Sequence, residues 1–234
     1  MSLKQICTKL LEDFLSYIMP FRCLMCQEVV MQANSFCPTC WGKLSFITKP
    51  FCQICSKILP FSVGNEAICL GCYQKPPLYD KARAVLKFDQ ESKKLIHNFK
   101  YYDRTNIAKA MALNMLNMHQ EILKEADVLI PVPMHKLKRM LRFYNQAFIL
   151  AKELSLLANK PILTDVLIKS KWTKSQATLS KKQRQSNLEN SFAINNPRLI
   201  KDKKVILVDD VLTTGSTATI CTKELKKHAS KVFV

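Results

Sequence analysis

Glycine is scarce in this sequence, and long uncharged apolar runs are missing from it. Only 4 of the 234 residues are glycine, so a glycine inside a loop marks a point where the backbone needs special freedom. No uncharged apolar run reaches the roughly 18 residues of a membrane-spanning helix, so we expect none. Acidic residues are also few. The sequence has 18 of them and 36 lysines and arginines, which gives a net charge of +18. This balance favours a polyanionic partner (nucleic acid, a phosphorylated ligand or an anionic membrane), although a solvated lysine-rich surface has the same composition.

The N-terminal segment lacks the features of a secretion signal. Glu12 and Asp13 interrupt its apolar stretch, and no small-residue cleavage site follows. We therefore expect a cytoplasmic protein, with peripheral attachment to the inner membrane as an alternative. Residues 1–20 carry apolar side chains at helical spacing and predict an amphipathic helix that ends at Pro20. Packing onto the rest of the protein is favoured over lying on a membrane surface.

Composition divides the remaining chain into a cysteine-rich part, residues 21–76, and a second part, residues 77–234. The second part alternates between apolar runs and helical periodicity, which predicts an α/β domain with helices flanking a parallel sheet. The polar stretch Lys171–Asn190 has little periodicity and predicts a long loop, which in a compact domain is usually functional. Strands are expected at Ala82–Phe88, Val128–Val132, Lys204–Val208 and Lys231–Val234, and helices at Ser92–Phe99, Ile107–Lys124, Asn145–Ala158 and Thr217–His228.

Ten cysteines in a reducing cytosol are metal ligands or free thiols rather than disulfides. Eight of them form four CxxC pairs, and two such pairs make a closed tetrahedral zinc site, which is structural rather than catalytic. One or two zinc ions are predicted, and the pairing stays open between a sequential and an interleaved arrangement. Cys7 and Cys221 stand alone on predicted helices and are expected to be small core residues. The predicted zinc ligands are Cys23, Cys26, Cys37, Cys40, Cys52, Cys55, Cys69 and Cys72.

The segment after the strand Lys204–Val208 has the composition of a loop that binds ribose and phosphate. Two carboxylates, Asp209 and Asp210, suit the hydroxyls of a ribose, and metal ligation by either of them is an alternative. The hydroxyl-rich turn beyond them leads into a helix, whose N-terminus offers unpaired N–H groups to an anion. The predicted phosphate ligands are Thr213, Thr214, Gly215, Ser216 and Thr217.

A Walker A loop and an ordinary N-capping turn are the two other interpretations of this loop. A Walker A loop is excluded because no Gly-Lys-Ser/Thr follows. The structural alternative is that the acid pair only begins an ordinary N-capping turn. The order of strand, acid pair, hydroxyl-rich turn and helix favours a ligand site at the carboxyl end of a parallel strand.

Val205–Thr217 resembles the phosphoribosyl-pyrophosphate (PRPP) signature of type I phosphoribosyltransferases. Across nearly the whole chain, the sequence is similar to the ComF family, the competence-associated proteins that include GntX. Besides this signature and the CxxC pairs, the resemblance rests on Ile130–His135, followed by basic residues and Asn145-Gln146, and on the segment Gln176–Asn187. It implies a type I phosphoribosyltransferase-like sheet with a small N-terminal zinc module.

The resemblance also implies roles for particular residues. Asp209 and Asp210 would bind the ribose of PRPP together with Mg²⁺, and the hydroxyl-rich turn its 5′-phosphate. Lys100 and Tyr101 match a Lys-Tyr pair of the family that lines or covers the cleft. Pyrophosphate would lie against Pro133, Met134, His135 and Lys136, and a flexible loop with Gln176, Ser180, Arg184 and Asn187 would close over the ligand.

The function implied by the resemblance is that of a PRPP-binding protein in natural competence, which handles incoming single-stranded DNA on the cytosolic side. Single-stranded DNA and proteins of the competence machinery are then the expected partners. Basic segments would follow the phosphate backbone, with Trp172, Phe143 and Tyr144 available for base stacking. Two alternatives stay open: an active phosphoribosyltransferase with an unidentified nitrogenous acceptor, and a sensor that binds PRPP without turnover.

Overall fold

The computed structural model describes residues 20–61, 64, 66–101, 105–134, 144–169 and 191–234. Several predicted features lie outside these residues, among them the helix over residues 1–20 and the loop Lys171–Asn190. The site residues that lie outside them are His135, Lys136, Gln176, Ser180, Arg184 and Asn187.

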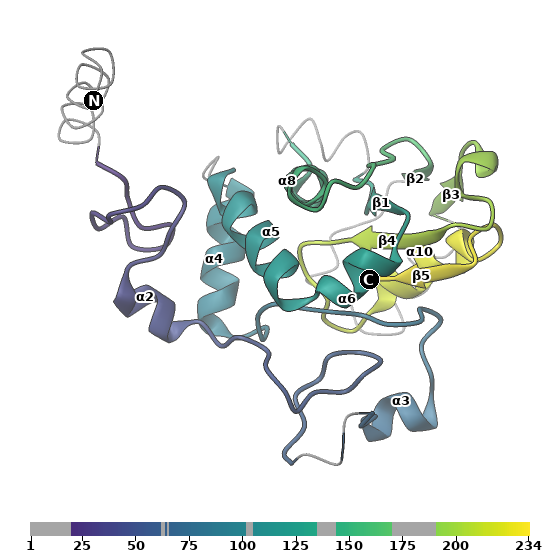
Figure 1. Cartoon of the computed structure of the whole chain (residues 1–234), viewed down its shortest axis with the longest axis horizontal. Helices are drawn as coiled ribbons and strands as arrows, with labels where there is room; N and C mark the ends of the chain where they lie inside the picture. The colour runs from purple at the N-terminus through teal and green to yellow at the C-terminus, as the bar shows by residue number, and fades with distance from the viewer. Residues whose placement is uncertain (1–19, 62–63, 65, 102–104, 135–143, 170–190) are drawn as a thin grey trace, which may run out of the picture.

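A parallel sheet forms the centre of the C-terminal part (Figure 1). Its strands β1 (Val128–Pro131), β4 (Lys204–Val208) and β5 (Lys231–Phe233) lie in the order β1-β4-β5. All of β1 and most of β4 are buried, as expected for parallel strands that are covered on both faces. The predicted α/β class, with a parallel sheet flanked by helices, is therefore confirmed.

The predicted strand Ala82–Phe88 is wrong as a regular strand. Its residues are extended, but they make only an isolated bridge, from Leu86 to Phe46. Their backbone groups bond to three different parts of the chain: Ala82 N to Ile54 O, Arg83 N to Val234 O, and Lys87 N to Ser45 O. Because the partners change every few residues, no continuous ladder forms. We call residues 82–88 the connecting segment.

A short antiparallel pair, β2 (Leu167–Lys169) and β3 (Phe192–Ile194), was not predicted from the sequence. Each strand has three residues, which is too short to show an alternating pattern. The two strands flank the stretch that the sequence predicts as a long loop.

Helices flank both faces of the sheet. The long predicted helix Ile107–Lys124 is interrupted at His119, where the backbone leaves the helical region (φ −133°, ψ 39°). The helices of this part are α4 (Gln90–Tyr101), α5 (Asn106–Met118), α6 (Gln120–Glu125), α8 (Gln146–Ala158), the 3-10 helix η2 (Pro197–Ile200) and α10 (Ser216–Leu225).

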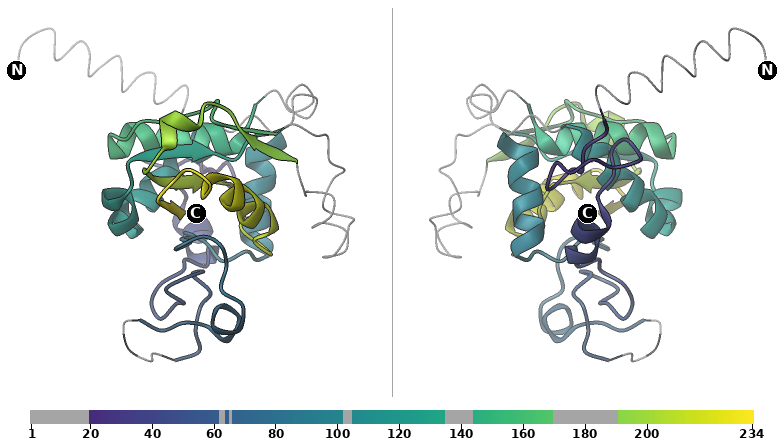
Figure 2. Two further views of the ribbon diagram at one scale, coloured as in Figure 1. Left: turned by 90° about the vertical axis from the view of Figure 1, so that its right-hand side faces the viewer. Right: turned by 90° about the vertical axis from the view of Figure 1, so that its left-hand side faces the viewer.

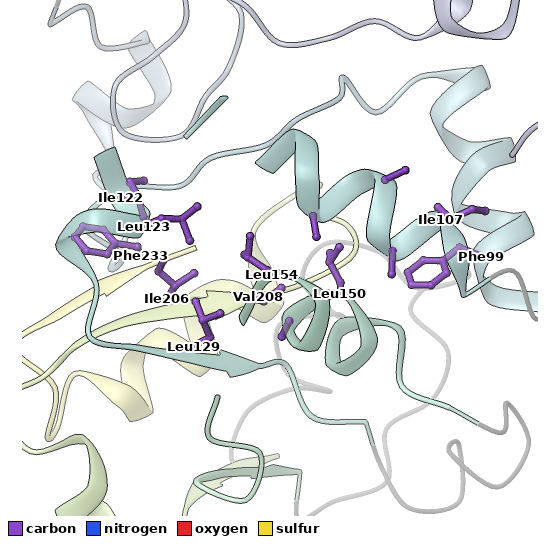
Figure 3. Packing of buried hydrophobic residues seen from close by; sticks show 14 of the residues in the cluster. Phe99, Ile107, Ile122, Leu123, Leu129, Leu150, Leu154, Ile206, Val208 and Phe233 are labelled. Atoms are coloured by element: carbon purple, nitrogen blue, oxygen red, sulfur yellow. The ribbon is translucent and has the colours of Figure 1, made fainter. Parts of the chain in front are cut away.

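The hydrophobic core is divided by the sheet into two clusters. Leu129, Ile206 and Val208 point to one face, where they pack with residues of α4, α5, α6 and α8 (Figure 3). The alternate residues of the strands, such as Ile130 and Leu207, pack on the other face with α10 and the β2–β3 pair. Cys221 of α10 is fully buried in this second cluster, so its predicted role as a small core residue is confirmed.

The cysteine-rich part lies beside the sheet domain (Figure 1 and Figure 2). It contains two short helices, α2 (Pro38–Lys43) and α3 (Leu70–Gln74), each of which starts next to a cysteine. Both halves bond to the connecting segment, the first through Ile47 N to Val85 O and the second through Ser56 Oγ to Ala82 O. The connecting segment is thus held between both cysteine modules and the sheet domain.

Candidate functional site

Eight thiols gather into two groups of four, in sequential order. Cys23, Cys26, Cys37 and Cys40 form the first group, and Cys52, Cys55, Cys69 and Cys72 the second; within each, the sulfur atoms all lie within 4.8 Å of one another. This decides the pairing that the sequence leaves open, in favour of the sequential arrangement.

The spacing of the sulfur atoms fits a tetrahedral zinc ion. The distance from Cys26 Sγ to Cys37 Sγ is 3.6 Å, and from Cys55 Sγ to Cys69 Sγ it is 3.7 Å. A Zn–S bond of about 2.3 Å gives a tetrahedral edge of about 3.8 Å. Four thiol ligands fill the coordination of zinc and leave no position for a substrate, so both sites suggest structural zinc.

Backbone N–H groups favour the thiolate form of one cysteine in each group. Burial raises the pKa of the Cys23 thiol, but N–H groups of Cys37, Cys26 and Met25 outweigh it and lower that pKa to about 6. The pKa of Cys52 falls to about 7 by the same balance in the second group. The pKa values of the Cys40 and Cys72 thiols are raised instead, chiefly by burial. The local structure therefore prepares one thiolate in each group, and zinc must displace protons from the others.

The acid pair lies at the carboxyl end of β4, as the sequence predicts. Asp209 and Asp210 follow directly after Val208, and the Asp210 N–H donates to Asp209 Oδ1 at 2.9 Å. Lys100, near the end of α4, forms an ion pair with Asp210, with 2.6 Å between Nζ and Oδ2. Both side chains of this pair are mostly buried. Lys100 thus contacts the acid pair, and its role in lining or covering the cleft stays a prediction.

The two carboxylates differ in their surroundings. Burial raises the pKa of Asp209 well above its usual value, and the negative charge of Asp210 raises it further. Lys100 acts in the opposite direction, but the effect is smaller. The surroundings thus favour the protonated form of Asp209, and hydrogen bonds donated by a ligand would stabilise its ionised form.

The hydroxyl-rich turn leads from the acid pair to α10. Gly215 precedes the helix with φ 71°, in the left-handed region that favours glycine. Thr213 and Thr214 are exposed, and the hydroxyls of Thr214 and Ser216 lie 2.9 Å apart. Among the described residues, no side chain caps the first N–H groups of α10. The turn therefore presents hydroxyls and free backbone N–H groups beside the acid pair.

The end of β1 lies next to the end of β4. Pro131 pairs with Val208, and the Val132 N–H donates to the Val208 carbonyl at 2.9 Å. Pro133 and Met134, which follow, are half-buried. The structure thus brings the described half of the predicted pyrophosphate segment to the same edge of the sheet as the acid pair.

Asn145 joins the end of β1 to the start of α8. Its Nδ2 donates to the Val132 carbonyl at 3.0 Å, and its Oδ1 accepts from the Ala147 N–H at 3.1 Å. One side chain thus caps the helix and fixes the strand end. Tyr144, in contrast, packs its ring 6.4 Å from that of Phe99 and donates its hydroxyl to the Phe99 carbonyl at 2.6 Å. Tyr144 is therefore engaged in the core, which weakens its predicted role in base stacking.

Sequence reasoning missed two features of the site. The first is His119, which the sequence pattern does not single out because a lone histidine in a predicted helix is usually structural. In the structure, His119 lies at the wall of a cavity that reaches Asp209 and Asp210. The ion pair between Lys100 and Asp210 also has no signal in the sequence beyond the Lys-Tyr motif. None of the helices in the described part of the chain is long and apolar enough to cross a membrane.

Comparisons with known proteins agree with this arrangement. The chain matches a double zinc ribbon domain over residues 14–77 and a phosphoribosyl transferase domain over residues 98–233. It is similar to competence protein F of Haemophilus influenzae, with 30% identity over 216 residues, which cover 88% of this chain and 91% of the relative. DNA utilization protein YhgH of Escherichia coli K12 is 28% identical over 92% of this chain and 95% of its own length.

A third relative, competence protein ComFC of Bacillus subtilis, is 26% identical over 230 residues, which cover 89% of this chain and 91% of the relative. The match to these proteins spans both the cysteine modules and the sheet domain. The chain therefore belongs to the ComF family of competence proteins, in which a double zinc ribbon precedes a phosphoribosyltransferase domain.

Proposed function

We propose that this chain binds PRPP with Mg²⁺ at the carboxyl end of β4, and that it handles incoming single-stranded DNA in the cytoplasm during natural competence. The observation that carries the first part is the position of Asp209 and Asp210 beside the uncapped start of α10. Two carboxylates and an anion-binding turn match the hydroxyls and the 5′-phosphate of one ligand.

In this proposal, the ligand spans the two neighbouring strand ends. The ribose hydroxyls donate to Asp209 and Asp210, and the 5′-phosphate accepts from Thr213–Thr217 and the N–H groups of α10. Pyrophosphate extends toward Pro133 and Met134, with His135 and Lys136 as further contacts. Mg²⁺ bound with PRPP would neutralise the charge of the pyrophosphate. The loop with Gln176, Ser180, Arg184 and Asn187 is proposed to close over the ligand.

Calorimetry with PRPP and Mg²⁺ tests this site. The double variant Asp209→Asn, Asp210→Asn should lose about 100-fold or more in affinity, because two charge-assisted hydrogen-bond acceptors are removed. The matched control is Asp165→Asn, Asp202→Asn, which makes the same charge change at two exposed residues and should bind like the wild type. Equal binding by both double variants would contradict the proposed site.

The role in DNA handling rests on the relatives' names, which refer to competence and DNA utilization, and on the net charge of +18. We expect single-stranded DNA to bind with an affinity that falls as salt rises, since lysines and arginines release counterions from phosphates. Fluorescence anisotropy across a salt series measures this slope. Binding that ignores salt would count against backbone recognition.

A charge variant locates the DNA contact. Lys181→Gln, Lys182→Gln, Arg184→Gln should weaken DNA binding and flatten the salt slope by about 0.7 for each lost phosphate contact. The control replaces the exposed Lys57, Lys75 and Lys124 by glutamine, which alters the net charge equally. A parallel test in the cell asks whether the wild type, but not Asp209→Asn, Asp210→Asn, restores transformation to Haemophilus influenzae that lacks competence protein F.

Phosphoribosyl transfer is the second candidate function, and the apolar cavity beside Asp209 favours it. In such a reaction, a nitrogen of the acceptor forms a bond to the anomeric carbon. The carbon–oxygen bond to pyrophosphate breaks, and pyrophosphate leaves with the electron pair. Pyrophosphate release in the presence of bases and amines tests this. If release is absent but PRPP changes the affinity for DNA, the chain acts instead as a PRPP sensor.

A further inference from the structure

A small cluster of packed side chains joins the second thiol group to the loop that we propose to bind PRPP. Tyr79, Ala82 and Ala218 are its buried members, and Ile54, Leu212 and Val234 pack against them. Ile54 belongs to residues 52–56, which contain the third CxxC pair and which we call the Ile54 knuckle. Leu212 belongs to the loop after β4. The cluster thus links a zinc module to the proposed PRPP site.

Hydrogen bonds hold the Ile54 knuckle against the connecting segment. The Ala82 N–H donates to the Ile54 carbonyl at 2.6 Å, and Ser56 Oγ donates to the Ala82 carbonyl at 2.8 Å. Arg83 Nη1 donates to the Gln53 carbonyl at 3.0 Å, and only 5% of the Arg83 side chain is exposed. Because these bonds fix the backbone on both sides of Ile54, its side chain has a defined position in the cluster.

The metal of the second thiol group fixes the shape of the Ile54 knuckle. Cys52 and Cys55 both belong to this stretch, and their thiols lie within 4.8 Å of the other two thiols of the group. The Ser56 N–H donates to the Cys52 carbonyl at 2.9 Å, and Ser56 has a left-handed φ of 60°. Small zinc modules are commonly folded with the metal and unfolded without it. Zinc release should therefore detach Ile54 from the cluster.

Leu212 and Ala218 lie directly before and after the predicted phosphate ligands, Thr213–Thr217. Both take part in the cluster, so the two ends of the hydroxyl-rich turn rest against the zinc module. Between these ends, Gly215 has its left-handed φ, and its carbonyl accepts from the Thr219 N–H at 2.7 Å. A turn that is restrained at both ends holds its hydroxyls in place before a ligand arrives, which lowers the entropic cost of binding.

The first thiol group packs against a different part of the protein. Leu24, which lies between Cys23 and Cys26, is 1% exposed and belongs to the first core cluster, together with residues of α4 and α5. Among the described residues, the cluster around Ala218 contains none from the first module. The two zinc sites are therefore not equivalent, because the cluster connects the hydroxyl-rich turn to the second site.

We propose that Ile54 is a positioning residue for the PRPP site, and that zinc in the second thiol group controls this site through it. Bound zinc holds Ile54 against the cluster, and the cluster holds both ends of the hydroxyl-rich turn. Zinc and PRPP then stabilise the same arrangement, so each raises the affinity of the chain for the other. This coupling rests on the proposed PRPP site and gives it a metal-dependent regulation.

Two isoleucine variants of the same module test the contact. Ile54→Ala removes the side chain from the cluster, whereas Ile68→Ala is the matched control, because Ile68 is 47% exposed and is not part of the cluster. In calorimetry of the zinc-loaded full chain with Mg²⁺, Ile54→Ala should bind PRPP at least about 5-fold more weakly, as coupled sites do, and Ile68→Ala should bind like the wild type. Ile54→Val, a smaller truncation, should recover most of the affinity. Equal affinity of Ile54→Ala and the wild type overturns the proposal.

The wild type tests the same coupling in the opposite direction and covers the case in which Ile54→Ala loses zinc or does not fold. A chelator withdraws zinc in the presence of Mg²⁺, with and without PRPP, while methyl NMR signals of Leu24 and Ile54 report on the first and the second site. PRPP should raise the zinc affinity of the second site at least about 5-fold, because coupling is reciprocal, and leave that of the first site unchanged. Bound PRPP that protects both sites equally, or neither, overturns the proposal. Asp209→Asn, Asp210→Asn controls for capture of zinc by free PRPP.

Hydrogen exchange without PRPP separates this proposal from the proposed function. The Thr219 N–H should exchange at least about 5-fold faster in Ile54→Ala than in the wild type and in Ile68→Ala, because its bond to Gly215 closes the restrained turn. The same acceleration is expected in the wild type once its second site has lost zinc. PRPP binding with unchanged exchange overturns the positioning role alone. Faster exchange, with no binding of PRPP to the wild type, overturns the proposed function alone.

Discussion

Lys100 Nζ lies 2.6 Å from Asp210 Oδ2, and this ion pair joins α4 to the loop that follows β4. Both side chains are mostly buried, with exposed fractions of 21% and 15%. The pair compensates for part of the cost of placing two neighbouring carboxylates, Asp209 and Asp210, in a poorly solvated site.

Loss of this ion pair should destabilise the fold. We expect Lys100→Met to lower the free energy of unfolding by about 1–2 kcal/mol, less than for a fully buried pair because some exposure remains. Urea denaturation at neutral pH measures this. In a double-mutant cycle with Asp210→Asn, the second substitution should cost less in the Lys100→Met background. Strictly additive losses would show that the two residues are not coupled.

Replacement of Asp209 should stabilise the fold while it removes ligand binding. Burial and the charge of Asp210 raise the pKa of Asp209, so the folded state holds the proton more tightly than the unfolded state. This contribution to stability is fully present below the ordinary pKa of aspartate and is lost as pH rises through the raised pKa.

Asp209→Asn should therefore be more stable than the wild type toward the alkaline side, and its stability should depend less on pH. Urea denaturation of the zinc-loaded proteins between about pH 6 and about pH 8 compares them. A variant that is less stable at the higher pH would contradict the assigned burial of the carboxylate.

Zinc content should follow the two thiol groups separately. We expect two zinc ions per chain, with the loss of one in Cys23→Ser, Cys26→Ser and of the other in Cys52→Ser, Cys55→Ser. Each site stabilises its module by on the order of 10–16 kcal/mol of apparent binding free energy, so partial occupancy is not expected.

Elemental analysis of the purified variants counts the metal. The control is Cys221→Ala. Cys221 is buried in the second core cluster, which contains none of the eight cysteines of the thiol groups. This variant should therefore keep two zinc ions. The variant that combines all four serines should lose both ions, because its two pairs belong to different sites. Retention of one ion would show that Cys23 and Cys26 share an ion with Cys52 and Cys55, as in an interleaved arrangement.

Gly215 should resist substitution for a conformational reason. Its φ of 71° is left-handed, and a Cβ would meet only Leu212 Cδ1 at 4.0 Å. The cost is therefore backbone strain and not a clash. Gly215→Ala should lower the free energy of unfolding by about 1–2 kcal/mol, and Gly215→Asn by less, because asparagine tolerates this region. Denaturation curves of the two variants test the order, and equal losses would indicate a steric cause.

The fold class and the metal ligands could be predicted from the sequence because their signals are local. Four CxxC pairs identify eight ligands, and Lys204–Val208 followed by two acids and a hydroxyl-rich turn indicates a strand, a loop and a helix. Apolar runs and periodicities depend on neighbouring residues only, so β1, β4, β5 and most helices follow from them.

The errors arose where distant contacts decide the local structure. The connecting segment has the composition of a strand, but its hydrogen-bond partners belong to two cysteine modules and to β5. The β2–β3 strands are too short for periodicity, and the break at His119 coincides with its contact to Ala84, which is 35 residues away.

By itself, the sequence determined which cysteines could hold zinc, which loop offers carboxylates and hydroxyls, and that the strands form a parallel sheet, because each depends on residue types at fixed short spacings. The tertiary structure alone decided how the thiols pair, that Lys100 forms an ion pair with Asp210, and that an apolar cavity lies beside the acid pair. These features depend on side chains that are far apart in the chain and meet only when the helices, the sheet and the cysteine modules pack together.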